Sequence, residues 1–326
     1  MTVNSKAVVA ILFILAQWVF TLSAAGAADF GIEDDQTVVD QAGRRIGVKK
    51  PFSRIISLYG AHTENLFALG GGDGLIGVAP NEDYPPEAGR KPVFSYHDDP
   101  EKFLAAKPDL VLTRPMIDRG YPQFVQRLEK SGITVVSLQP GTVEEMLVYW
   151  QILGILTGRR DLAAAMAARF KAAVSELKAL TASVSPKKRV YFEAIHAKMK
   201  TFAPDSMAVF ALEAAGGVNI ARDAAPVRDT NIAAYGKERI LAHASEIDVF
   251  LAQSGTMNQP TLELIKAESG FQAIRAVKTH QVYIIDERLV SRPTLRLLDG
   301  IFEIGRILYP DDFTERAREI ITRAKQ

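Results

Sequence analysis

Hydrophobic and polar positions alternate in short blocks along most of the chain, beginning after position 50. The segments 53–58 (SRIISL), 109–113 (DLVLT) and 133–138 (ITVVSL) are short aliphatic and β-branched runs, which predict strands. Between the last two, residues 121–132 place apolar side chains at steps of three and four, the spacing of an amphipathic helix. Strands and helices in regular alternation predict parallel sheets with helices on both faces.

Two consecutive helices are predicted in the middle of the chain. The first covers 142–158 and opens with Thr142 and Glu145, the spacing of a capping box. The second covers 160–182 and carries a regular apolar stripe along its whole length. A long uninterrupted helix between two α/β regions can act as a stiff spacer.

The strand–helix alternation resumes after the polar break at 183–188, with strands predicted at 189–195, 247–253 and 280–286. The predicted fold class is therefore α/β, with two Rossmann-like lobes, each built on a parallel sheet, joined by a single long α-helix. The expected division of the mature chain is an N-terminal lobe (28–158), a connecting helix (159–183) and a C-terminal lobe (184–326).

Residues 1–27 have the layout of a secretory signal. Lys6 supplies a positive charge, an apolar run follows at 7–22, and Ala25 and Ala27 form a small-residue cleavage pattern. An uncleaved anchor helix is the alternative, but the run is shorter than the roughly 20 residues that a membrane span needs. We therefore expect export to the periplasm, cleavage after Ala27 and a soluble mature protein.

Composition and charge exclude several kinds of site. Lys plus Arg total 39 and Asp plus Glu total 38, so the net charge is +1 and no strong positive field is available to hold nucleic acid. The chain has no cysteine, which excludes disulfides, thiolate metal sites, thiol catalysis and the lipid-bearing cysteine of a lipoprotein.

Catalytic and nucleotide-binding motifs are not found. Gly72, Gly74 and Gly77 match G-x-G-x-x-G, but a helix is predicted before them and a strand after them, the reverse of a dinucleotide-binding turn. The histidines lack metal-ligand spacing, so no metal site is assigned, and no residue can be assigned as nucleophile or general base. We expect a binding protein with no cofactor of its own. An exported α/β hydrolase for an anionic substrate is a less favoured alternative.

Polar and aromatic residues collect where the predicted strands end, which is where α/β sheets bind ligands. Arginine offers forked donors to carboxylates, and aromatic rings stack on flat ligands. These loops predict a cleft for a bulky, flat and partly anionic molecule, although any one residue in them could simply be solvated. The candidate ligand-binding residues are Tyr59, His62, Tyr96, His97, Arg114, Arg119, His196, Lys200, Met257 and Arg292.

Several ordered segments resemble a known family. The most specific is EKFLAAKPDLVL followed by LEKSGITVVSL, and the segments RIISLYGAHTENLFALGGGDGLIGV and FQAIRAVKTHQVYIID add to it. Together they resemble the substrate-binding proteins of ABC importers for iron chelates and cobalamin. The resemblance implies two lobes on one long helix, a cleft between the lobes, and docking on the permease through one glutamate from each lobe. By motif these are Glu101 and Glu238, although each could also be a helix-start glutamate without a partner.

The ligand is not carried over by the resemblance, because Tyr59 and Gly60 stand where relatives often have a small residue and proline. The arginine and tyrosine loops favour an iron complex of siderophore or haem type, with cobalamin, another corrinoid or another metal chelate or oxyanion as the alternative. We expect a monomer that delivers this ligand to an ABC permease in the inner membrane. A sensor that presents its ligand to a membrane signalling protein would use the same fold.

Overall fold

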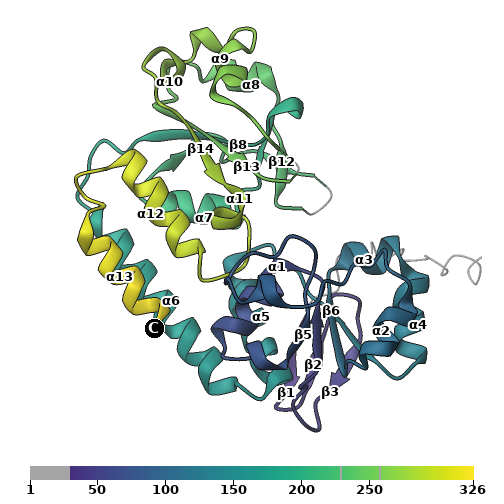
Figure 1. The fold of residues 1–326 in the computed structure, drawn as a ribbon. Helices are drawn as coiled ribbons and strands as arrows, with labels where there is room; N and C mark the ends of the chain where they lie inside the picture. Colours follow the sequence, from purple (N-terminus) through teal and green to yellow (C-terminus); the bar gives the residue numbers. More distant parts are fainter. Residues whose placement is uncertain (1–29, 228–229, 257) are drawn as a thin grey trace, which may run out of the picture.

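A computed structural model describes residues 30–227, 230–256 and 258–326 as two α/β lobes joined by helix α6, Arg160–Leu180 (Figure 1). This confirms the predicted fold class. The predicted signal at 1–27 lies outside the described residues. No helix in the described part of the chain combines the length and apolar character needed to cross a bilayer.

The N-terminal lobe is built on a four-stranded parallel sheet of order β5-β4-β6-β7. Its strands are almost entirely buried, as expected for a parallel sheet covered on both faces. The strands are β4 (Ile55–Ser57), β5 (Leu75–Gly77), β6 (Leu110–Thr113) and β7 (Thr134–Ser137). The helices are α1 (Gly60–Ala68), α2 (Pro100–Ala106), α3 (Pro115–Gly120), α4 (Pro122–Lys130) and α5 (Val143–Thr157).

A small antiparallel sheet precedes this lobe and was not predicted. Its strands are β1 (Gly31–Asp34), β2 (Thr37–Val39) and β3 (Arg45–Gly47). They are short, and only Val38 and Ile46 in them are buried, so they lack the apolar run that marks the buried strands.

The C-terminal lobe has a mixed sheet of order β11-β12-β9-β8-β13-β14, with β10 paired to β8. The expectation of a wholly parallel sheet is wrong here, because β8 and β9 are joined by the single turn at His196–Lys198, which is too short for a parallel crossover. The parallel strands are β8 (Arg189–Ile195), β10 (Val218–Asn219), β13 (Val249–Ser254) and β14 (Val282–Asp286). The antiparallel strands are β9 (Lys200–Phe202), β11 (Ala225–Pro226) and β12 (Ile232–Ala234). The helices are α7 (Met207–Ala214), α8 (Lys237–Ala242), α9 (Leu262–Ala267), α10 (Arg275–Lys278), α11 (Glu287–Val290) and α12 (Leu297–Leu308).

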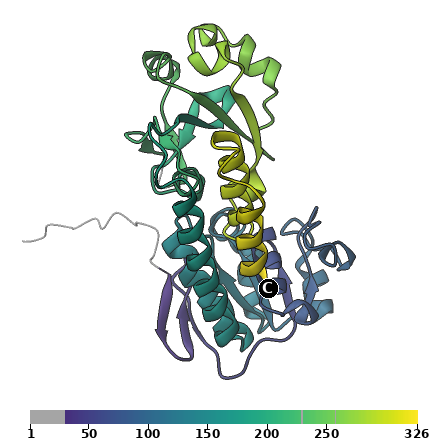
Figure 2. The same ribbon diagram turned by 90° about the vertical axis from the view of Figure 1, so that its left-hand side faces the viewer.

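The connecting helix is reinforced by a second helix. The 21 residues of α6 extend roughly 32 Å, and α13 (Glu315–Lys325) lies along it (Figure 2). Arg323 of α13 pairs with Glu176 of α6 at 2.6 Å, and Arg169 Nε donates to the Ala324 carbonyl at 3.2 Å. The strut between the lobes is therefore two helices thick over part of its length, which resists bending.

Apolar packing also runs without interruption from one lobe to the other. A single buried cluster contains Trp150 of α5, Phe170 of α6 and Leu298 of α12. The Trp150 and Phe170 rings meet edge to face with centroids 5.4 Å apart, and Trp150 Nε1 donates to the Pro293 carbonyl at 3.2 Å. The lobes are thus joined by packing as well as by the connecting helix.

Candidate functional site

Tyr59 and Arg114 lie together at the carboxyl edge of the N-terminal sheet. Tyr59 follows β4 as the N-cap of α1, and Arg114 follows β6 as the N-cap of α3. The Arg114 guanidinium carbon lies 4.7 Å from the centre of the Tyr59 ring, within cation–π range. Arg114 Nε is buried and has no hydrogen-bond partner in the described part of the chain. Neighbouring strand ends therefore bring an aromatic face and a cation to one place.

Tyr96, His97 and Tyr121 form an aromatic cluster at the same lobe. The Tyr96 ring centroid lies 4.3 Å from that of His97 and 4.8 Å from that of Tyr121, and the His97 and Tyr121 centroids lie 5.1 Å apart. The two tyrosines are half-buried and His97 is exposed. Tyr96 and His97 precede α2, whereas Tyr121 lies between α3 and α4, so the fold assembles the cluster from separate loops. Arg119 is exposed near the end of α3.

His62 does not line a surface, which corrects the expectation drawn from its position. The side chain is fully buried, with Nδ1 2.7 Å from the Tyr149 hydroxyl and Nε2 2.8 Å from the Thr113 carbonyl. Burial lowers the pKa of His62 to about 4, so the ring is neutral near pH 7. With both nitrogens engaged, His62 supports α1 from inside the lobe and offers no group to a ligand.

His196 forms a buried pair with Glu193 at the end of β8. Its Nδ1 lies 3.0 Å from both Glu193 carboxylate oxygens, and this hydrogen bond raises the pKa of His196. His196 Nε2 is buried without a partner among the described residues. The backbone N–H of His196 donates to Asn258 Oδ1 at 3.0 Å, which fixes the turn. Lys200 is half-buried on β9, and Met257 lies outside the described residues.

Arg292 is held in an ion cluster between the lobes rather than in a solvated loop. Its Nη1 lies 3.0 Å from Glu64 Oε1 and 3.6 Å from Glu82 Oε2. Arg296 donates from Nε to Glu64 Oε2 at 2.8 Å and pairs with the same carboxylate through Nη2. The Arg296 guanidinium lies over the ring of Tyr84, with its central carbon 4.3 Å from the ring centroid. We call Glu64, Glu82, Arg292 and Arg296 the interlobe ion cluster.

The close approach of Gly60 and the burial of Glu82 affect the geometry and the charge of this cluster. A Cβ at Gly60 would lie too close to Arg292 Nη1 and the Glu82 carboxylate, so a larger residue here would require these side-chain ends to move. Burial raises the pKa of Glu82 to about 6, despite the attraction of Arg292. Sequence reasoning missed Glu64, Glu82 and Arg296 because their partners are distant in the chain. The spacing of Arg292 and Arg296, four residues apart, was the one local signal.

The expected docking glutamates lie where their motifs place them. Glu101 is in the first turn of α2, with its side chain 62% exposed and paired with Arg127 at 2.7 Å. Glu238 is exposed in the first turn of α8. Both carboxylates thus sit at helix amino ends, where the helix dipole favours negative charge.

The described residues hold no group of three or more His, Cys, Asp or Glu side chains placed to bind a metal ion. The aromatic and cationic groups at the strand ends suit non-covalent capture of a ligand. Such a site can hold a chelate that brings its own ligands to the metal.

Comparisons with known proteins agree with this fold. The chain is 28% identical over 284 residues to an uncharacterized ABC transporter substrate-binding lipoprotein, YvrC, of Bacillus subtilis, covering 86% of this chain and 87% of the relative. It is 27% identical over 260 residues to a vitamin B12-binding protein of Vibrio cholerae, covering 78% and 89%. A solved structure described as a possible iron-binding (periplasmic solute-binding) protein of Staphylococcus epidermidis superposes with a TM-score of 0.70 at 26% identity, covering 80% and 100%.

The family model for periplasmic binding proteins matches residues 55–289, which include strands and helices of both lobes. This match covers well over half of the chain and extends across the connecting helix. The protein therefore belongs to the periplasmic binding protein family.

Proposed function

We propose that this protein captures a metal chelate with a flat, partly anionic framework and delivers it to an ABC permease. The observation that carries the proposal is the cluster of Tyr96, His97 and Tyr121 in the N-terminal lobe, which also carries the Tyr59–Arg114 pair. Tyrosine faces suit a flat macrocycle, and the arginine suits carboxylate or phosphate groups at its edge. Two chelate types fit. The name of the Staphylococcus protein supports an iron complex, of siderophore or haem type, and that of the Vibrio relative supports a corrinoid.

His97 is the residue that we propose to approach the metal. Its ring is exposed and rests against both tyrosines, so it can reach a bound chelate without breaking a buried contact. A chelate fills most of the metal's coordination positions, so one imidazole suffices to complete the shell. Binding through His97 would change the absorption spectrum of the chelate, which gives a direct readout.

Calorimetric titration with cyanocobalamin, ferric protoporphyrin and a ferric catecholate siderophore tests the ligand class. We expect one of these to bind, and Tyr96→Ala and Tyr121→Ala each to weaken it by about tenfold. Tyr283→Ala, which changes a half-buried tyrosine of β14 outside the cluster, is the matched control. If no chelate binds the unmodified protein, the ligand proposal fails while membership of the family stands.

We also propose that Glu101 and Glu238 contact the permease. One lies on each lobe, both are exposed, and both occupy first turns of helices. Exposed charges of this kind steer association and set the register of a docked partner.

A further inference from the structure

The loop that follows β5 reaches from the N-terminal lobe to the C-terminal lobe. Its base is closed by a hydrogen bond from the Val78 N–H to the Pro92 carbonyl at 3.0 Å. Within the loop, the side chain of Ala88 is fully buried against the lobe. A loop whose ends meet and whose interior is packed holds its tip, residues 82–84, in a defined position.

Each of the three consecutive tip residues contacts an arginine of the C-terminal lobe. The pairs are Glu82 with Arg292, Asp83 with Arg288, and Tyr84 with Arg296. The arginines stand at every fourth position, in α11 and in the segment that leads to α12. Figure 1 shows α11 on the side of the C-terminal lobe that faces α1. The tip and the arginines therefore match residue by residue across the boundary between the lobes.

Arg288 is directed at the tip by its own lobe. Its Nε and Nη2 donate to Asp286 Oδ2 at 2.9 and 2.7 Å, which leaves Nη1 for Asp83 Oδ2 at 3.0 Å. Because Asp286 already fixes the guanidinium, little side-chain freedom is lost when Asp83 approaches it. The contact between the lobes can therefore form and break at a small cost in entropy.

The tip contacts are easier to break than the contact between α1 and the segment before α12. The side chains of Asp83 and Arg288 are 69% and 38% exposed, so water and salt weaken their attraction. Glu64 and Arg296 are buried, and separating a buried pair leaves uncompensated charge. Motion of one lobe away from the other therefore breaks the Asp83–Arg288 pair before the Glu64–Arg296 pair.

We propose that residues 82–84 are a clasp that fastens the two lobes to each other and releases them when the lobes rock apart. Binding proteins of this kind enclose their ligands by hinge motion of two domains. When the clasp is closed, it adds to α6 in fixing the distance between the lobes. When it is open, the buried contacts of Glu64 remain as the pivot. The clasp concerns the motion of the lobes and does not depend on the chelate proposal.

The distance between two spin labels, one on each lobe, tests the clasp. The chain has no cysteine, so Gln126→Cys in α4 and Glu263→Cys in α9 place the labels at exposed positions. Asp83→Arg sets two arginines against each other and should lengthen the mean label distance by about 2 Å or more. Combining it with Arg288→Asp restores opposite charges and should restore the distance. Both variants should melt within a few degrees of the unmodified protein, because the pair is exposed.

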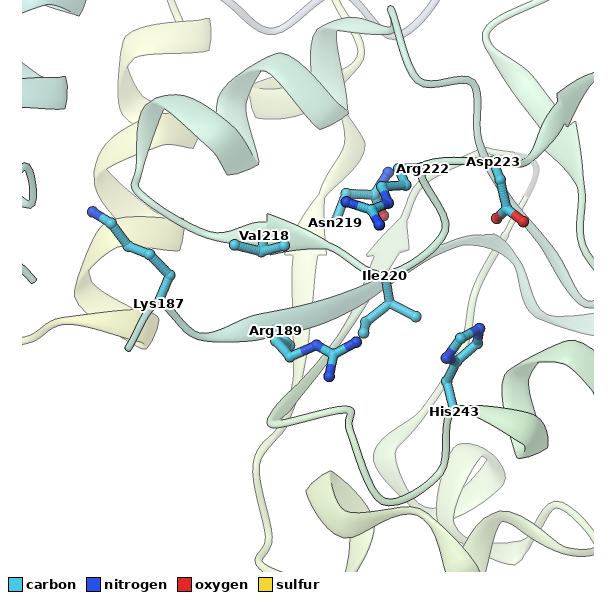
Figure 3. A pocket seen from close by; sticks show the side chains of 8 residues that line it. All are labelled: Lys187, Arg189, Val218, Asn219, Ile220, Arg222, Asp223 and His243. Carbon is cyan, nitrogen blue, oxygen red and sulfur yellow. The ribbon is translucent and has the colours of Figure 1, made fainter. Parts of the chain in front are cut away.

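The matched control is Asp223→Arg in the C-terminal lobe. Asp223 lines a groove of about 650 Å³ at the amino ends of β8 and β10 (Figure 3) and pairs with Arg239. The side chains of this pair are 66% and 41% exposed, close to the values for Asp83 and Arg288, but both residues belong to one lobe. The control variant should therefore leave the label distance unchanged.

Salt should act in opposite directions on the two proteins. Raising NaCl from about 0.05 M to about 0.5 M screens the attraction in the unmodified protein and lengthens its label distance. In Asp83→Arg the same salt screens a repulsion and shortens the distance. The proposal is overturned if Asp83→Arg leaves the distance unchanged, if the combined variant restores none of it, or if Asp223→Arg lengthens it equally. Should the Arg288→Asp change prevent folding, the control and the salt response decide alone.

Discussion

Glu64 in α1 and Arg296, 232 positions later, form a buried ion pair in which Arg296 Nε donates to Glu64 Oε2 at 2.8 Å. Their side chains are 3% and 11% exposed. Beside them, Asn65 Nδ2 donates to the Pro293 carbonyl at 2.8 Å. The first helix of one lobe is therefore bonded to the segment that enters α12 of the other. Together with α6, these bonds limit how far the lobes can separate.

Removal of Glu64 should destabilise the protein strongly. Glu64→Ala leaves the buried Arg296 without its carboxylate and leaves Arg292 with Glu82 alone. Breaking one partner of a buried pair costs about 3–5 kcal/mol. Urea denaturation at pH 7 measures the loss. As a control, Arg323→Ala breaks the exposed pair with Glu176 and should cost no more than about 1 kcal/mol. Similar losses in the two variants would show that the interlobe ion cluster contributes little.

Glu82 should make stability fall as pH rises. Its pKa is raised to about 6 from an ordinary value of 4.5, so the folded state holds the proton more tightly than the unfolded state. Below pH 4.5 both states are protonated, and above pH 6 the folded state bears the cost of a buried charge. Between these values, unmodified protein should lose about 2 kcal/mol of unfolding free energy relative to Glu82→Gln.

Denaturation of the two proteins from pH 4.5 to 7.5 measures this difference. Glu87→Gln changes a nearby exposed carboxylate and should run parallel to the unmodified protein. If the unfolding free energy of Glu82→Gln varies with pH in parallel with that of the unmodified protein, Glu82 does not carry a buried charge.

His62 should make the protein sensitive to acid. Its pKa is lowered to about 4 from 6.5, so the unfolded state takes up a proton at a higher pH than the folded state. This contribution to stability is complete above pH 6.5 and is lost as pH falls to 4, by about 3 kcal/mol. His62→Gln should show a flatter pH dependence in this window, whatever its stability at pH 7.

The matched change for His62 is His280→Asn. His280 is exposed and has a φ of 58°, a conformation that asparagine tolerates. This variant should keep the full acid sensitivity of the unmodified protein. If it loses that sensitivity and His62→Gln keeps it, the buried imidazole is not the cause.

Charge reversal at Glu101 or Glu238 should weaken binding to the permease without weakening binding of the chelate. Glu101→Arg and Glu238→Arg remove exposed carboxylates outside the aromatic cluster, so chelate affinity should be unchanged. Affinity for the permease in proteoliposomes should fall by about tenfold or more for each variant. Glu315→Arg, at an 81% exposed position of α13, is the control for a general charge effect. Equal losses in all three variants would argue against specific docking residues.

Local pattern was sufficient for most of the secondary structure. The apolar runs at 53–58, 109–113 and 133–138 are the buried strands β4, β6 and β7, because a strand covered on both faces must be apolar throughout. The capping box at Thr142 and Glu145 marks the start of α5. The β1–β3 sheet and the His196 turn were exceptions. Nothing in the composition of the turn distinguished a hairpin from the end of a parallel strand.

The class of the fold, the long connecting helix and the family can all be read from the amino-acid sequence, because each depends on periodicity and on short ordered motifs. The roles of individual polar residues follow from contacts that form only in the folded protein. His62 became a buried support when α5 brought the Tyr149 hydroxyl against it, and Arg292 became part of an ion cluster when Glu64 reached it across 228 positions. The burial and charge of a side chain depend on neighbours that are distant in the chain, and no local pattern encodes which neighbours those are.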